Sequence, residues 1–130
     1  MQIVLLGLAG AGKGTQGQLL GKRWNLAHVA SGDLFRSNQA QATELGLLAK
    51  SYMERGELVP DQITIQMILK RISDWDCEQG FILDGFPRTL PQAVALDQAL
   101  EVKGITRAIY INVSEKELIR RLSDRLTCRE

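Results

Sequence analysis

The chain has 130 residues, of which 45% are apolar and 24% charged, as expected of one globular domain. Sixteen basic residues against fifteen acidic ones leave a net charge of +1, which argues against a nucleic-acid or membrane-surface partner. No apolar run approaches the roughly 20 residues of a membrane span. Cys77 and Cys128 match no disulfide framework and favour a reducing compartment, so we expect a cytoplasmic protein.

Strands and helices are expected to alternate along the chain. Short apolar runs predict buried strands, and apolar residues at helical spacing predict helices. In chain order we expect a strand at 3–6, a helix to about Trp24, a strand at 26–30, two small helices within 31–56, a helix capped by Asp61, a strand at 81–83, a helix from Thr89, a strand at 108–113 and a helix after Ser114. Ser114 and Glu117 predict a capping box at the start of a helix whose core-facing residues are expected to be Leu118, Ile119, Leu122 and Leu126. The alternation predicts an α/β fold with a parallel sheet.

Residues 7–16 have the features of a phosphate-binding loop. They follow a buried strand and open a helix, so glycine backbone N–H groups and the positive end of the helix dipole converge on one point. Lys13 adds a charge that can reach the outer phosphates. The general pattern places Ser or Thr directly after this lysine, whereas here Gly14 follows and Thr15 comes one residue later. This departure indicates either an inactive site or a sub-family with different metal ligation.

Two further polar motifs follow predicted strands, and ligands bind beyond the carboxyl ends of parallel strands. Asp84-Gly85-Phe86-Pro87-Arg88 offers a carboxylate suited to a magnesium-bound water and an arginine suited to phosphate. Ser31-Gly32-Asp33 starts a helix that carries Arg36. The cations expected at this edge of the sheet are Lys13, Arg36, Arg88, Arg121 and Arg125. That charge suits two phosphorylated ligands placed end to end, and phosphoryl transfer between them needs no catalytic histidine. His28, a lone histidine beside a predicted strand, is expected to be packed or at the surface rather than catalytic.

These motifs resemble those of the adenylate kinase family of nucleoside monophosphate kinases. The matching segments are residues 10–16 with glycine after the lysine, 31–36, 56–60, 84–89 with Gln92, and 121–125. The resemblance implies a three-layer P-loop kinase core at 1–30 and 61–125, with a small helical nucleoside-monophosphate-binding insertion at 31–60. It also implies reversible phosphoryl transfer from ATP to AMP, with Mg²⁺, by a protein that is a monomer when complete.

The resemblance assigns roles to individual residues. Catalysis would involve Lys13, Arg88, Arg121 and Arg125. ATP would be bound by Gly10, Ala11, Gly12, Lys13, Gly14, Thr15, Arg121 and Arg125. AMP would be bound by Ser31, Arg36, Glu57, Leu58, Val59, Gly85, Phe86, Pro87, Arg88 and Gln92. Asp84 and Asp33 would order magnesium-bound waters, and Gln92 would read the adenine edge or complete a capping box with Thr89.

The family pattern continues past Arg125 into a mobile lid, so residues 126–130 correspond to the start of a truncated lid. Cys128 lies where zinc-binding lids have the first cysteine of a Cys-x-x-Cys pair, and one cysteine does not make a zinc site. One alternative is a UMP/CMP kinase, although such enzymes tend to have alanine in place of Ser31. The other is a nucleotide-binding module with little turnover, because a site without a lid does not exclude water.

Overall fold

The computed structural model describes residues 1–101 and 103–123. Within them the strands are β1 (Gln2–Leu6), β2 (Ala27–Ala30), β3 (Phe81–Asp84) and β4 (Arg107–Tyr110). The helices are α1 (Lys13–Trp24), α2 (Ser31–Ala40), α3 (Glu44–Glu54), α4 (Asp61–Ile72), α5 (Leu90–Leu100) and α6 (Glu115–Ser123), and a 3₁₀ turn, η1 (Trp75–Cys77), precedes β3. The predicted alternation of strands and helices is confirmed.

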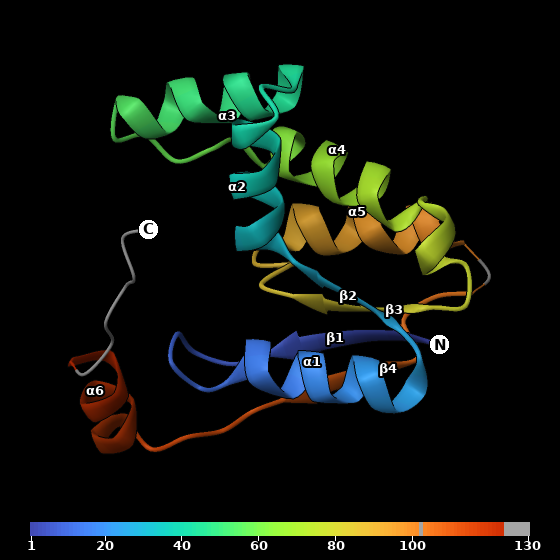
Figure 1. The fold of residues 1–130 in the computed structure, drawn as a ribbon, viewed down its shortest axis with the longest axis vertical. Helices are drawn as coiled ribbons and strands as arrows, with labels where there is room; N and C mark the ends of the chain where they lie inside the picture. Colours follow the sequence, from blue (N-terminus) through green and yellow to red (C-terminus); the bar gives the residue numbers. More distant parts are fainter. Residues whose placement is uncertain (102, 124–130) are drawn as a thin grey trace.

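The described strands form one parallel sheet in the order β2-β3-β1-β4. Helix α1 covers one face, and α4 with α5 covers the other, which gives three layers (Figure 1). The predicted α/β fold with a parallel sheet is therefore confirmed. Since all neighbouring strands are parallel, their carboxyl ends lie at one edge of the sheet, on the left in Figure 1, where the loop after β1 begins.

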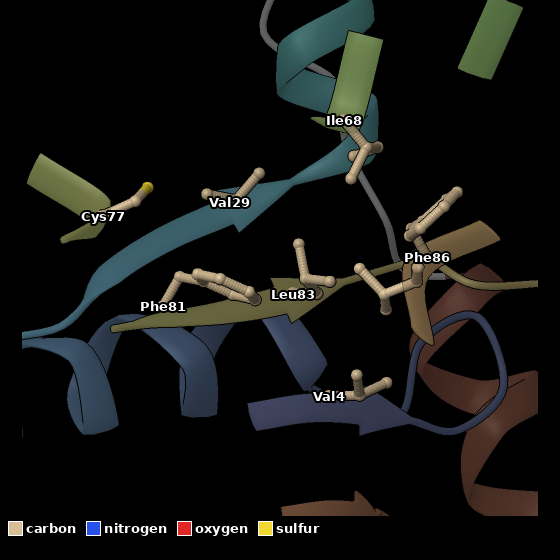
Figure 2. Packing of buried hydrophobic residues seen from close by; sticks show 8 residues of the cluster. Val4, Val29, Ile68, Cys77, Phe81, Leu83 and Phe86 are labelled. Carbon is tan, nitrogen blue, oxygen red and sulfur yellow. The ribbon is translucent and has the colours of Figure 1, made fainter. Parts of the chain in front are cut away.

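Successive strand residues point to opposite faces of the sheet and so divide the core in two. Val4, Val29 and Leu83 face the α4–α5 side and pack with Ile68 and Phe86 (Figure 2). The alternate positions form a second cluster, which joins the sheet to α1 and contains Ile3, Leu5, Ile82, Leu26 and Leu20. A sheet buried on both faces explains why these strands are continuously apolar in sequence.

Helix α2 starts at the carboxyl end of β2 and runs away from the sheet, and α3 lies beyond α4, farthest from the sheet (Figure 1). They pack on α4 through a separate small core around Ala49, Ile63 and Met67. Thr43 caps α3 as predicted, because its hydroxyl accepts a hydrogen bond from Gly46 N–H at 3.1 Å. Among the described helices, none combines the length and the apolar character that crossing a membrane requires.

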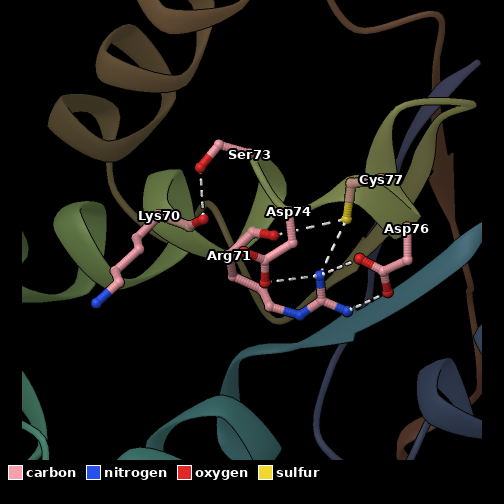
Figure 3. A network of polar contacts seen from close by, with 6 residues as sticks. All are labelled: Lys70, Arg71, Ser73, Asp74, Asp76 and Cys77. Atoms are coloured by element: carbon pink, nitrogen blue, oxygen red, sulfur yellow. Dashed lines mark hydrogen bonds and ion pairs between the residues drawn. The ribbon is translucent and has the colours of Figure 1, made fainter.

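A polar cluster stabilises the chain between α4 and β3 (Figure 3). The Arg71 guanidinium donates two hydrogen bonds to the Asp76 carboxylate, at 2.8 and 2.7 Å, and a third to Cys77 Sγ at 3.2 Å. The guanidinium lowers the pKa of Asp76, whereas burial raises the pKa of the Cys77 thiol to about 11. The thiol therefore stays protonated near neutral pH and packs as a small apolar group.

Two predictions about the last described elements are wrong. β4 ends at Tyr110 rather than at residue 113, because its partner β1 ends at Leu6 and turns into the loop. Ile119 and Leu122 do not face the core, since 59% and 43% of their surface is exposed while Leu118 is buried. Leu126 lies outside the described residues. Helix α6 lies beside the loop after β1 instead of over the sheet (Figure 1).

Candidate active site

Two adjoining pockets open at the carboxyl edge of the sheet. The first, of about 570 Å³, is lined by the loop after β1, the start of α1 and the end of β3, and we call it the loop pocket. The second, of about 470 Å³, lies between α2, residues 57–59 and the starts of α4 and α5, and we call it the α2–α5 pocket. Both are lined by Ser31, Gly32, Arg36, Gly85 and Arg88. The pockets therefore meet and offer room for two ligands end to end.

The loop after β1 curves around the Lys13 ammonium. Lys13 Nζ donates to the carbonyl oxygens of Gly7 and Leu8, both at 3.0 Å. Gly12 precedes α1 with φ +95°, a conformation that favours glycine. Helix α1 has no side-chain cap, so the N–H groups of its first turn are available to an anion. Of the residues predicted to bind ATP, this pocket is lined by Gly10, Gly12, Lys13, Gly14, Thr15 and Arg121, whereas Ala11 is buried.

Glycines on α1 make room for polar side chains of the sheet. A Cβ atom on Gly14 would lie 3.5 Å from Asp84 Oδ2, and one on Gly17 would lie only 2.4 Å from His28 Nε2. His28 and Asp84 share the α1 face of neighbouring strands, with His28 Nε2 3.7 Å from Asp84 Oδ2. His28 Nε2 is buried and has no hydrogen-bond partner in the described part of the chain. His28 is thus packed against α1, as expected, and it also lines the loop pocket.

Four of the five predicted cations line the loop pocket, and each is held by an acceptor of the protein. The three arginines come from different elements: Arg36 from α2, Arg88 from the segment after β3, and Arg121 from α6. Arg36 pairs with Asp33, and Arg88 Nε donates to Gly85 O at 2.7 Å. Arg125, the fifth predicted cation, lies outside the described residues.

Glu117 holds Arg121 and therefore does not complete the capping box that was predicted with Ser114. Ser114 Oγ does accept from Glu117 N–H at 3.4 Å, but the Glu117 carboxylate accepts from Arg120 and Arg121 instead of reaching back to Ser114. Hydrogen bonds from these two arginines lower the pKa of Glu117 to about 2. Arg121 Nη1 also reaches the carbonyl of Gly10 at 3.5 Å, which ties α6 to the phosphate loop.

The α2–α5 pocket collects most residues expected to bind AMP. It is lined by Ser31, Arg36, Glu57, Leu58, Val59, Gly85, Arg88 and Gln92. Leu58 is 94% exposed and lies at the wall of this pocket. Phe86 and Pro87 line neither pocket: Phe86 is 1% exposed and packs in the core. Ser31 Oγ is buried and donates to Gly85 O at 3.1 Å.

The residue that sequence reasoning missed in this pocket is Asp61. It was expected to cap α4, but Pro60 occupies that position and Asp61 is the first residue of the helix. Its carboxylate accepts from Thr89 Oγ1 and from Gln92 Nε2, both at 2.7 Å. Thr89 caps α5 as predicted, whereas Gln92 Oε1 accepts from Arg88 N–H and not from Thr89 N–H. No spacing in the sequence relates Asp61 to Gln92, because they come together only where α4 meets α5.

The carboxylates of the loop pocket fit a magnesium ion carried in by a nucleotide. Within the described residues, no group of three or more His, Cys, Asp or Glu side chains is placed to hold a metal ion. Asp33 and Asp84 nevertheless line the loop pocket. Mg²⁺ keeps several waters and is bound through one or two carboxylates plus substrate phosphates, which this donor set can supply. Cys128, the predicted zinc ligand, lies outside the described residues.

Comparison with known proteins identifies the family of this chain. The adenylate kinase family model matches residues 5–127. Proteins named adenylate kinase are 57% identical over 98% of the chain in Dehalococcoides mccartyi, 53% over 99% in Methanocella arvoryzae and 51% over 100% in Carboxydothermus hydrogenoformans. The chain spans 60–62% of the length of these relatives. With its pockets, its phosphate loop and this extent of identity, the chain belongs to the adenylate kinase family.

Proposed function

We propose that this chain carries the two nucleotide sites of an adenylate kinase, which transfers the terminal phosphoryl group of ATP to AMP and gives two molecules of ADP. The observation that carries the proposal is the meeting of the two pockets at Arg36 and Arg88. An acceptor phosphate held there would face a donor phosphate held by the loop. Phosphoryl transfer depends mainly on such positioning and on neutralisation of charge.

ATP would occupy the loop pocket. Its phosphates would bind the backbone N–H groups of residues 10–15, and Lys13 Nζ would exchange the carbonyls of Gly7 and Leu8 for phosphate oxygens. Arg121 projects from α6 toward the same loop and would bridge the donor and the transferred group. The proposed catalytic residues are Lys13, Arg88, Arg121 and Arg125.

AMP would occupy the α2–α5 pocket, with its phosphate on Arg36 and Arg88 and its base beside Ser31, residues 57–59 and Gln92. An oxygen of the AMP phosphate would form a bond to the γ-phosphorus of ATP, and the bond from that phosphorus to the leaving ADP oxygen would break. The attacking phosphate is already ionised, so no general base is required. Its repulsion from the donor phosphates is the main obstacle, and the converging arginines would reduce it.

Asp84 and Asp33 would hold water ligands of a nucleotide-bound Mg²⁺, which would neutralise charge on the ATP phosphates. Asp33 is paired with Arg36 in this structure. Phosphate binding by Arg36 would free the Asp33 carboxylate for this role. The 31–60 insertion, a cytoplasmic location and a monomeric complete protein also stay predictions.

An ADP-formation assay with ATP, Mg²⁺ and each of AMP, CMP and UMP tests the proposal. We expect AMP to be the preferred acceptor and Lys13→Met to abolish turnover. Equal or faster rates with CMP or UMP would favour the pyrimidine kinase alternative. Measurable ATP and AMP binding without ADP formation would favour a nucleotide-binding module with little turnover.

A further inference from the structure

A hydrogen-bond network around the buried Gln92 side chain joins α4, α5 and the segment after β3. Gln92 lies at its centre and is only 5% exposed. Its Nε2 donates to Asp61 Oδ1 at 2.7 Å, and its Oε1 accepts from Arg88 N–H at 2.8 Å. The other oxygen of Asp61 accepts from the Thr89 hydroxyl at 2.7 Å. Each end of the Gln92 amide is therefore held by one partner.

The Asp61 carboxylate and the Arg88 N–H favour the same direction of the Gln92 amide. An ionised carboxylate only accepts, so the group facing it must be the NH₂ end of Gln92. The carbonyl end then faces Arg88 N–H, which only donates. Rotating the amide by half a turn would place oxygen against the carboxylate and NH₂ against N–H, so both partners would be lost at a buried site.

A fixed amide direction matters because the two ends of Gln92 differ toward a ligand. After these two bonds, the amide retains one N–H and one oxygen lone pair, and Gln92 lines the α2–α5 pocket. A 6-aminopurine offers an acceptor at N1 and a donor at N6, whereas a 6-oxopurine offers a donor at N1 and an acceptor at O6. For one placement of the base, one amide direction pairs with the first edge and the reversed direction pairs with the second.

We propose that Asp61 is a specificity-determining positioning residue, which fixes the Gln92 amide so that the pocket prefers a 6-aminopurine monophosphate over its 6-oxo analogue. This inference rests on the proposed function, because it takes the α2–α5 pocket as the AMP site. Asp61 acts through Gln92 alone and need not touch the nucleotide. Its contribution is to discrimination between bases rather than to phosphate binding.

The test compares AMP with inosine monophosphate, its 6-oxo analogue, by calorimetric titration of the 130-residue chain. Asp61→Asn keeps the shape but makes reversal of the Gln92 amide less costly, because the new side chain can turn its own NH₂ toward a reversed amide and only Arg88 N–H then opposes the reversal. We therefore expect the ratio of the AMP to inosine monophosphate affinities to fall about tenfold, as for loss of one hydrogen bond to a charged group. Thr89→Val is the matched control, because it removes the other hydrogen bond to the same carboxylate and the cap of α5. The control should keep the wild-type ratio.

An unchanged ratio in Asp61→Asn would overturn the inference, and so would an equal fall in Thr89→Val, which would indicate a general loosening of the α4–α5 contact. A second readout needs no nucleotide: the Gln92 side-chain NH₂ protons, followed by their resonances, should exchange with solvent faster in Asp61→Asn than in the wild type, because a neutral amide oxygen accepts more weakly than a carboxylate. An unchanged exchange rate in the variant would refute the role of Asp61 in holding the Gln92 amide. If the wild type binds neither nucleotide, the proposed function fails, while the resonances still decide the role of Asp61.

Discussion

The close packing of Gly17 against His28 predicts how a substitution at Gly17 changes the free energy of unfolding. In Gly17→Ala, the new Cβ would lie 2.4 Å from His28 Nε2 and 2.6 Å from Cδ2, distances that real Cβ atoms do not tolerate. The imidazole would have to move, and since only 15% of its surface is exposed, it would have to move toward the loop pocket. Overpacking of this kind costs about 1–3 kcal/mol.

Alanine also has a higher helix propensity than glycine, by about 1 kcal/mol. The two effects oppose each other, so we expect Gly17→Ala to lower the free energy of unfolding by about 1 kcal/mol. In a His28→Ala background the clash is absent, and the same substitution should stabilise the chain by about 1 kcal/mol. The coupling between the two positions should then be about 2 kcal/mol.

Urea unfolding followed by circular dichroism measures all four proteins of this double-mutant cycle. Gly14→Ala is the matched control on the same helix, because its Cβ would meet Asp84 Oδ2 at an ordinary contact distance of 3.5 Å. Its stability should equal or exceed that of the wild type. Equal effects of Gly17→Ala in both backgrounds would show that His28 does not fill the space beside Gly17.

Three further predictions concern other parts of the molecule. Arg88→Lys should weaken AMP binding at least tenfold in a calorimetric titration, because a lysine cannot replace the two-pronged contact of a guanidinium with phosphate. The Arg71 guanidinium lowers the pKa of Asp76, so the stability from this pair should be present above the pKa of Asp76 in the unfolded chain and lost as pH falls through its pKa in the folded chain. In Asp76→Asn, the free energy of unfolding measured by urea titration should therefore depend less on pH in the acidic range. Solvent screening should keep the difference in free energy between the variant and the wild type below about 1 kcal/mol. Burial and a pKa of about 11 should keep Cys77 unreactive toward a thiol reagent at pH 8 until urea unfolds the chain, and rapid labelling of native Cys77 would contradict the packing described here.

The sequence was most informative where a local pattern has a local cause. Continuous apolar runs predicted the parallel strands, because a strand covered on both faces has no polar side. Parallel strands end at one edge of a sheet, so the motifs at Lys13, Ser31 and Asp84 were expected to meet, and the structure brings them into one pair of pockets. That much of the candidate site follows from strand order along the chain and from the residue types at strand ends.

The failures arise where a helix face or a side chain has more than one available partner. Ile119 and Leu122 have the periodicity of a buried helix face, yet α6 rests beside the phosphate loop and leaves them exposed. Glu117 fits a capping box, but two arginine side chains compete for its carboxylate more effectively than one backbone N–H. Local patterns record only the possible partners of a side chain, and its three-dimensional neighbours decide among them.

The sequence by itself determined the α/β fold, the glycine-rich loop after β1 and four cations beside it, because each depends on residues close in the chain or on the general behaviour of parallel sheets. Only the tertiary structure decided how these parts are held. It placed Asp61 against Gln92, 31 residues away, and put His28 in the space that Gly17 leaves on α1. Such fits depend on the distance between two packed elements, to within about an ångström, and no pattern along a single element specifies that distance.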